Sequence, residues 1–203
     1  MHFYGGIDPG SASGGMGIVD IKGRYVNAFR WDQKNPRKIW TLLLDLSDKL
    51  SLIYLEDVNL PRKPGKIEEK YSASGGLAVN FGIWQGFLIA LNIPYVLVHP
   101  SSWQAVYGIY HWKKLQAKGQ PAKSPLDLAR DYFLDASLEF QADSGIAVGL
   151  LLAKLAAHDA TRGLDRGALR EVRQESPRRR KRPPGPSKRP RPPFYGSGGL
   201  RVQ

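Results

Sequence analysis

The sequence predicts an α/β fold, in which a mixed five-stranded sheet is flanked by helices. Two observations carry this prediction. Three short apolar runs of strand type come first, and segments with helical and strand periodicity alternate after them. The chain has 203 residues, of which the last segment differs in composition, so the foldable part has the size of one domain with a substantial core.

The first three predicted strands form an antiparallel meander. Residues 3–8 are an apolar run that ends on Asp8, because a Pro-Gly pair breaks the strand directly after it. Residues 15–21 and 25–31 supply the next two strands. Lys22-Gly23 between them has the composition of a tight turn.

A helix, a strand and a second helix are predicted next. Residues 36–50 have apolar side chains at helical spacing, and residues 52–58 form a buried strand that carries Glu56. Residues 59–76 are rich in Pro, Gly, Lys and Glu, and we expect a long functional loop there. A helix with an apolar side follows over 77–91.

The fifth predicted strand covers residues 93–98. A short helix follows His99, and Ser101 or Ser102 is expected to cap its N-terminus. Residues 110–123 are polar and basic, and they are expected to form a second loop.

Two helices complete the predicted domain. Ser124-Pro125 opens a helix that runs to about residue 134, with proline at the favoured first position. The strongly apolar segment 146–158 must pack against the sheet. His158 and Asp159 are expected to be the exposed polar end of this last helix.

Charge is concentrated near the C-terminus. The net charge is +12, and the segment from Ser176 onward has nine Lys or Arg and no acid, which leaves +3 for the rest. This segment has seven prolines and no apolar periodicity, so it is expected to be a disordered polycationic arm that favours phosphate backbones. A solubilising tail or a localisation signal is the alternative. The chain therefore divides into a domain over 1–163 and a tail over 164–203.

Composition also limits the possible classes of protein. Cysteine is absent, so a disulfide scaffold and a thiolate zinc site are excluded, and an intracellular protein is expected. The most apolar windows, 81–98 and 145–157, are interrupted by polar residues or too short to span a bilayer. The first residues lack the basic and apolar regions of a secretory signal.

Two acids stand at predicted strand ends, Asp8 in the first strand and Glu56 in the fourth. These strands can be neighbours in such a topology, and a third acid at the start of the last helix would complete a cage of carboxylates. Hard oxygen ligands favour Mg²⁺ or Mn²⁺, and two such ions suit hydrolysis of a phosphodiester. Taken alone, Asp8 also fits an ordinary turn before Pro-Gly.

Several short motifs, taken in order, carry a family resemblance. They are Gly6–Ser11, Tyr54–Asp57, Phe81–Gly86, Ile93–Tyr95 and Pro100–Trp103. Over roughly residues 1–158 the chain resembles the RuvC-like Holliday junction resolvases, especially the phage-type branch. The resemblance implies a ribonuclease-H-like fold, a homodimer, a divalent metal and paired nicking of four-way DNA junctions. Asp8 and Glu56 fall on the first two acidic positions of the family.

The last helix departs from the family pattern, which has an acid before an apolar run and another acid or His one turn earlier. Matching the apolar run puts Val148 at the main acidic position. Matching residues 141–143 instead puts Asp143 at the earlier acid and Ile146 at the main one. Asp143 shares a helix face with Ile146 but nearly opposes Val148. Asp143 is therefore either the third metal ligand or the N-cap of the helix.

The candidate DNA contacts are basic residues of the two predicted loops. The first loop contributes Arg62, Lys63 and Lys66, and the second contributes Lys113, Lys114, Lys118 and Lys123. The second set is interleaved with aromatic residues, which is typical of nucleic-acid contact, and it falls in the DNA-facing region of the family.

Three functions compete. The first is a homodimeric endonuclease that resolves branched DNA with about two Mg²⁺ or Mn²⁺ ions per site, held by Asp8, Glu56 and Asp143. The second is a catalytically impaired junction-binding relative, because an aliphatic residue, Ile146 or Val148, replaces the usual acid. The third takes residues 6–11 as the phosphate loop of an actin-like ATPase or sugar kinase. That class needs a second Gly-rich phosphate loop, which the sequence lacks.

Overall fold

The computed structural model of the protein describes residues 2–10, 14–32, 34–58, 67–133 and 144–164, and over 67–74 only the path of the backbone. Asp143 and, apart from Leu164, the whole predicted tail lie outside these ranges. No helix among the described residues is long and apolar enough to cross a membrane.

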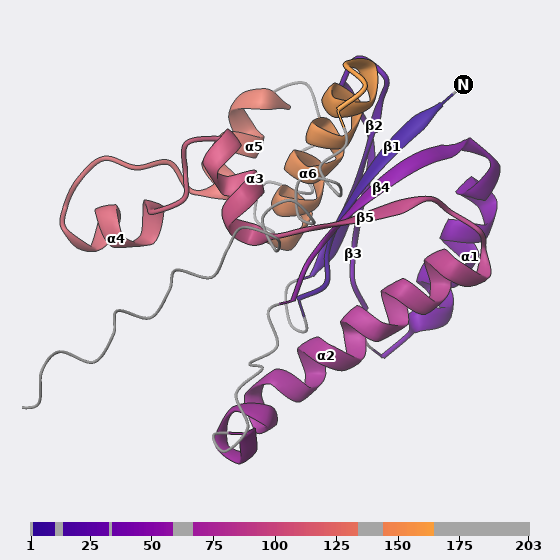
Figure 1. Ribbon diagram of the computed structural model, residues 1–203, viewed down its shortest axis with the longest axis horizontal. Helices are drawn as coiled ribbons and strands as arrows, with labels where there is room; N and C mark the ends of the chain where they lie inside the picture. Colours follow the sequence, from indigo (N-terminus) through magenta and orange to yellow (C-terminus); the bar gives the residue numbers. More distant parts are fainter. Residues whose placement is uncertain (1, 11–13, 33, 59–66, 134–143, 165–203) are drawn as a thin grey trace, which may run out of the picture.

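A mixed sheet of five strands forms the centre of the domain, as the sequence predicts (Figure 1). The strands are β1 (Phe3–Asp8), β2 (Gly15–Asp20), β3 (Tyr25–Arg30), β4 (Leu50–Glu56) and β5 (Tyr95–Val98). Their spatial order is β3-β2-β1-β4-β5, in which β1 to β3 are an antiparallel meander and β4 runs parallel to both β1 and β5. The first and fourth strands are therefore neighbours.

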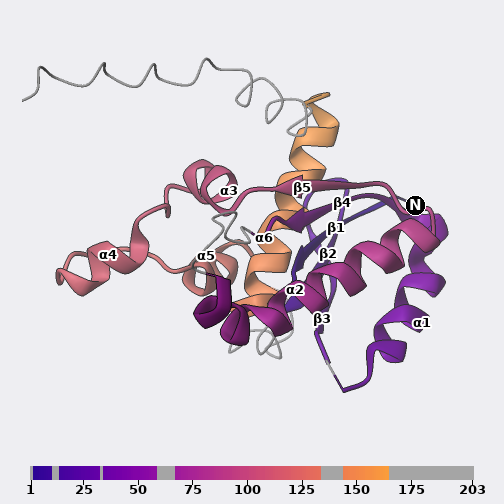
Figure 2. The same ribbon diagram turned by 60° about the horizontal axis from the view of Figure 1, so that its bottom comes forward.

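Helices cover both faces of this sheet (Figures 1 and 2). They are α1 (Pro36–Leu46), the 3₁₀ turn η1 (Ser47–Lys49), α2 (Ile67–Ala90), α3 (Pro100–Val106), α4 (Trp112–Ala117), α5 (Pro125–Tyr132) and α6 (Ser144–Thr161). Side chains of α1 and α2 pack with Ile7 and Ile53 on one face. Side chains of α3, α5 and α6 pack with Tyr4 and Tyr54 on the other. Figure 2 shows α4 standing off from the body of the domain.

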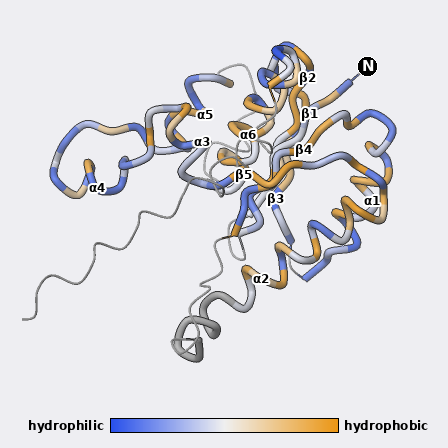
Figure 3. Tube along the Cα trace, in the orientation of Figure 1, coloured by the Kyte–Doolittle hydropathy of each residue, from blue (hydrophilic) through white to orange (hydrophobic). Residues whose placement is uncertain are grey.

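Helix α6 lies directly on the sheet because glycines at the contact remove side chains. A Cβ on Gly6 of β1 would lie 2.2 Å from the carbonyl oxygen of Gly149 and 2.3 Å from the amide nitrogen of Ala153. A Cβ on Gly17 of β2 would lie 2.4 Å from the amide nitrogen of Leu150. The apolar character of α6 is plain in Figure 3, whereas α4 has a larger hydrophilic share. This close packing places the first turn of α6 beside the carboxyl end of β1 and the amino end of β2, where Asp8 pairs with Gly15.

Two predicted loops contain helices. The prediction of a loop over 59–76 is wrong for its second half, because α2 begins at Ile67; residues 59–66 lie outside the described ranges. The Glu, Lys and Ala residues of this segment are strong helix formers, which its glycines and prolines concealed. The loop predicted over 110–123 contains α4.

Several predicted boundaries also shift. The helix predicted over 36–50 ends at Leu46 and continues as η1, so β4 covers Leu50–Glu56 rather than 52–58. Helix α3 is capped by His99, whose Nδ1 accepts a hydrogen bond from the amide of Ser101 at 3.2 Å, and not by a serine. Helix α5 begins at Pro125 as predicted, and Ser124 caps it, with Asp127 completing a capping box.

Candidate functional site

Asp8 and Glu56 end neighbouring parallel strands. Ile7 of β1 pairs with Leu55 of β4, so each acid lies one residue beyond a paired position, at the same edge of the sheet. Both acids also face α6. Gly6, two residues before Asp8, contacts α6, and Tyr54, two residues before Glu56, bonds a residue of α6. The two carboxylates therefore share one edge and one face.

The Asp8 carboxylate is oriented by the turn that follows β1. The amide of Gly10 donates a hydrogen bond to Asp8 Oδ1 at 2.8 Å, and the carbonyl of Gly10 accepts one from the amide of Gly14 at 3.1 Å. A Cβ on Gly14 would lie 2.3 Å from the Gly10 oxygen, so the tightness of this turn requires glycine. The turn is joined to the sheet by the amide of Trp31, which donates to the Gly14 carbonyl at 2.8 Å.

The Glu56 carboxylate is oriented by a tryptophan. Trp103 of α3 is buried, and its indole Nε1 donates a hydrogen bond to Glu56 Oε1 at 2.8 Å. Burial raises the pKa of the Glu56 carboxyl above its ordinary value of 4.5, and the hydrogen bond from Trp103 opposes this rise in pKa. A cation beside Glu56 would lower the pKa of the carboxyl and relieve the cost of burying its charge.

The described residues contain no group of three or more His, Cys, Asp or Glu side chains that could hold a metal ion. Asp143 lies outside the described ranges. A Cβ on Gly15 of β2 would lie 2.9 Å from the Ile146 amide, so the start of α6 packs on β2 at this point. Val148 is one turn before Leu152, which contacts Gly6, so it lies on the helix face toward β1. An aliphatic residue thus stands on the α6 face nearest to Asp8.

The two carboxylates fit a hard divalent cation. Asp8 and Glu56 together offer oxygen donors from two adjacent strands, and Mg²⁺ is commonly bound by one or two carboxylates together with water and substrate phosphate. The chain contains no cysteine, so no thiolate is present to favour a softer metal. The donor set is therefore suited to one such ion, and a second ion would need further oxygen ligands.

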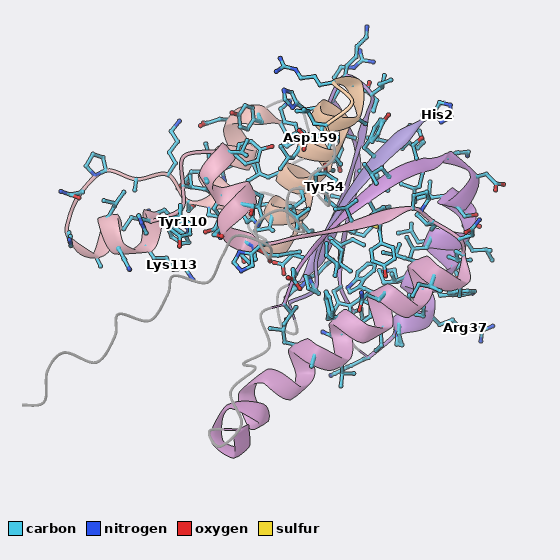
Figure 4. The ribbon with its side chains drawn as sticks, in the orientation of Figure 1. His2, Arg37, Tyr54, Tyr110, Lys113 and Asp159 are labelled. Atoms are coloured by element: carbon cyan, nitrogen blue, oxygen red, sulfur yellow. The ribbon has the colours of Figure 1, made fainter. Side chains whose placement is uncertain are left out.

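The burial of Asp159 differs from the sequence prediction. Its exposure is 0%, and Tyr54 of β4 donates its hydroxyl to Asp159 Oδ2 at 3.0 Å, so the prediction of an exposed helix end is wrong for this residue. His158 is exposed, with its Nδ1 3.2 Å from Asp159 Oδ1. Figure 4 shows Tyr54 and Asp159 close together. Asp159 shares a helix face with Leu152 and Val148, and this spacing is the signal by which its burial could have been found.

The basic residues of α4 lie beyond α3, which follows the carboxyl end of β5. The last residue of β5, Val98, pairs with Glu56, so this part of the chain leaves the sheet at the edge where the acids lie. Lys113, Lys114 and Lys118 are exposed, and Lys113 lies over the Trp112 ring with its Nζ 5.4 Å from the centroid. Figure 4 shows Lys113 and Tyr110 on this projecting part.

The other predicted DNA contacts are Lys123, which already has an acidic partner, and three basic residues that the structure does not describe. Lys123 is exposed but pairs with Asp131, with the Nζ and Oδ2 atoms 2.5 Å apart, and this carboxylate raises the pKa of the lysine. Arg62, Lys63 and Lys66 lie outside the described ranges.

Comparison with known proteins identifies the fold. No protein-family model matches the chain, and no curated protein matches it. It is similar to the structure of Thermus thermophilus RuvC in complex with Holliday junction substrate, with a TM-score of 0.54 and 14% identity over 80% of this chain and 97% of that one. A second Thermus thermophilus RuvC structure gives a TM-score of 0.53 and 19% identity over 79% and 96%. The predicted ribonuclease-H-like fold is thereby confirmed.

Proposed function

We propose that the protein is a metal-dependent endonuclease that resolves four-way DNA junctions by paired phosphodiester hydrolysis. The observation that carries the proposal is the pair of acids Asp8 and Glu56, which end adjacent parallel strands on one face of a RuvC-like sheet. The similar Thermus thermophilus RuvC structure is a complex with Holliday junction substrate, and this supports branched DNA as the substrate class.

In this proposal Asp8 and Glu56 hold Mg²⁺ or Mn²⁺, and Asp143 is the third ligand. When bound, such ions supply an activated water and stabilise the leaving 3′ oxygen. The chain itself holds the two carboxylates in place. The Gly10 amide fixes one oxygen of Asp8, and the Trp103 indole fixes one oxygen of Glu56.

Lysines are proposed to bind the DNA backbone. Lys113, Lys114 and Lys118 are exposed on or next to α4, and residues 71–126 contain no Asp or Glu that would repel phosphate. The same role is proposed for Lys123 and, outside the described residues, for Arg62, Lys63 and Lys66, and the basic tail would add affinity without reading sequence.

A homodimer is proposed to form through α2. Gly75, Val79, Gly82, Gly86 and Ile89 alternate spacings of four and three residues, which is the seam of a helix pair. Val79 and Ile89 are 56% and 67% exposed, and a Cβ on any of the three glycines would meet no atom of the described residues within 4 Å. A second copy of α2 would cover this α2 stripe, and the dimer would carry two active sites for paired nicks.

A second candidate is a junction-binding protein that does not cut. The aliphatic side chains of Ile146 and Val148 at the start of α6 favour it, because an acid there would be the natural third ligand. Binding of junction DNA by the lysines would not require a metal.

Cleavage of a labelled four-way junction beside a matched linear duplex, in Mg²⁺, Mn²⁺ or EDTA, separates the candidates. The wild type is expected to make symmetric nicks in the junction only, and EDTA and Asp8→Asn are expected to abolish them while binding is kept. Loss of nicking in Asp143→Asn would assign the third ligand. Tight junction binding without nicks in either metal would establish the second candidate, and cutting by Asp8→Asn would refute the proposed site.

A further inference from the structure

Asn80 is a polar side chain in the apolar face of α2. Its exposure is 0%, and Trp84 and Leu88, one and two turns along the same face, belong to the apolar cluster between α2 and the sheet. Within the described part of the chain, Asn80 Oδ1 has no hydrogen-bond partner. A half-satisfied buried amide costs free energy that an apolar side chain would not, so packing does not explain Asn80.

The amide of Asn80 reaches the turn that orients Asp8. Asn80 Nδ2 donates to the carbonyl oxygen of Gly10 at 3.4 Å, while the amide of the same Gly10 donates to Asp8 Oδ1 at 2.8 Å. The direction of the Asn80 side chain follows from this contact, because the reversed amide would place oxygen against oxygen. One glycine is thus linked at its carbonyl to α2 and at its amide to the Asp8 carboxylate.

The contact is better suited to orientation than to stability. At 3.4 Å the bond is longer than the usual range for N–H···O and is weak. The Gly10 carbonyl also accepts from the Gly14 amide at 3.1 Å, so it keeps a partner when Asn80 is removed. What is lost is a restraint on Gly10, and glycine has the greatest backbone freedom of any residue.

We propose that Asn80 is a positioning residue, which sets the Asp8 carboxylate by restraining the backbone of Gly10. The inference rests on the catalytic role proposed for Asp8, and it adds a residue from the opposite face of the sheet to the machinery of that site. Asn80 does not touch the reacting atoms, and its effect passes through the Gly10 amide.

Two substitutions of Asn80, one by a larger side chain and one by a smaller, test this role. Asn80→Leu adds bulk and Asn80→Ala removes it, and both delete the amide. Gln85→Leu is the matched control, because it deletes an amide of the same helix that bonds the Tyr95 hydroxyl at 3.3 Å. Three quantities are measured for the full chain: exchange of the Gly10 amide hydrogen by NMR, kcat and Kd for the junction, and the melting temperature.

In both Asn80 variants the Gly10 amide is expected to exchange faster, and kcat to fall by about 10–100-fold, the usual effect of losing an outer-shell partner. The junction Kd stays at the wild-type value, and Asn80→Leu melts no lower than the wild type. In Gln85→Leu neither the Gly10 exchange rate nor kcat changes.

Unchanged Gly10 exchange in both Asn80 variants would overturn the inference, as would a loss of kcat that Gln85→Leu reproduces. The proposed function fails in a different way. A wild type that binds but never cuts, with Gly10 exchange still faster in the Asn80 variants, would refute the endonuclease and leave the positioning contact standing.

Discussion

At the scale of single residues, the candidate site contains a buried carboxylate, Glu56, whose charge costs free energy of folding, and a tryptophan that orients it. Glu56 is buried enough to raise its pKa, yet it stands at a strand end with one oxygen committed to Trp103. Such a group weakens the fold at neutral pH, because the folded state binds its proton more tightly than the unfolded state does, and this advantage is lost when the carboxyl ionises. A destabilising acid of this kind is typical of a functional site.

Glu56→Gln is expected to stabilise the metal-free protein at pH 7 and to abolish cleavage. The folded pKa of Glu56 is raised, so the wild type loses stability as pH rises from about 4.5 through the folded pKa, and the neutral amide avoids this loss. Gln keeps an acceptor oxygen for Trp103. Thermal melts at pH 4 and pH 7 in EDTA check the sign, and a variant that is less stable than wild type at pH 7 would contradict it.

Trp103→Phe should move the acid limb of the pH–rate profile to higher pH. The indole N–H lowers the pKa of Glu56, so its removal lets burial raise the pKa further, and more base is needed to form the carboxylate. We also expect a loss of about 1–3 kcal/mol in stability from the smaller ring. The profile of kcat/KM against pH is the measurement, with Trp112→Phe as control, and an unshifted acid limb would argue against this role of Trp103.

At the scale of elements, the sequence predicts the strands and helices that a local pattern of apolar and turn residues encodes. The strands were predictable because apolar runs stop at turn residues such as Gly23, whose φ is +72°. This punctuation also marks Asp8 and Glu56 as strand-end acids. Helix α4 was missed because it lies off the core and has no apolar period to show. Asp159 and Asn80 were missed because their partners are Tyr54 and Gly10, which lie 105 and 70 positions away in the sequence.

The α4 region offers a test of DNA binding with an internal control. Lys114→Ala combined with Lys118→Ala is expected to reduce the slope of log Kd against log salt by about 2, because each lysine on a phosphate contributes nearly one released counterion. Lys123→Ala should change the slope less, since Asp131 already pairs with this ammonium. Electrophoretic mobility shifts of the junction over a range of KCl measure both, and equal effects from all three lysines would disprove the distinction.

At the scale of the whole molecule, the sheet separates two surfaces. The α6 face holds the Asp8–Glu56 edge, and the opposite face is covered by α1 and α2. The α2 stripe faces away from the sheet, and no atom of the described residues lies within 4 Å of a Cβ built on its glycines. Pairing through α2 would therefore leave both acid sites open, which a resolvase needs in order to cut two strands of one junction.

Gly82→Leu is expected to separate dimerisation from folding, because its effects on the two have opposite signs. In the monomer the change replaces glycine by a good helix former in open space, which should stabilise α2 by up to about 1 kcal/mol. In a helix pair the added side chain would force the two backbones apart. Sedimentation velocity should show the wild type as a dimer and Gly82→Leu as a well-folded monomer, with the two junction nicks no longer coupled. The control is Thr41→Leu, which adds bulk at an exposed position of α1 away from the stripe and should remain dimeric. A dimeric Gly82→Leu would place the interface elsewhere.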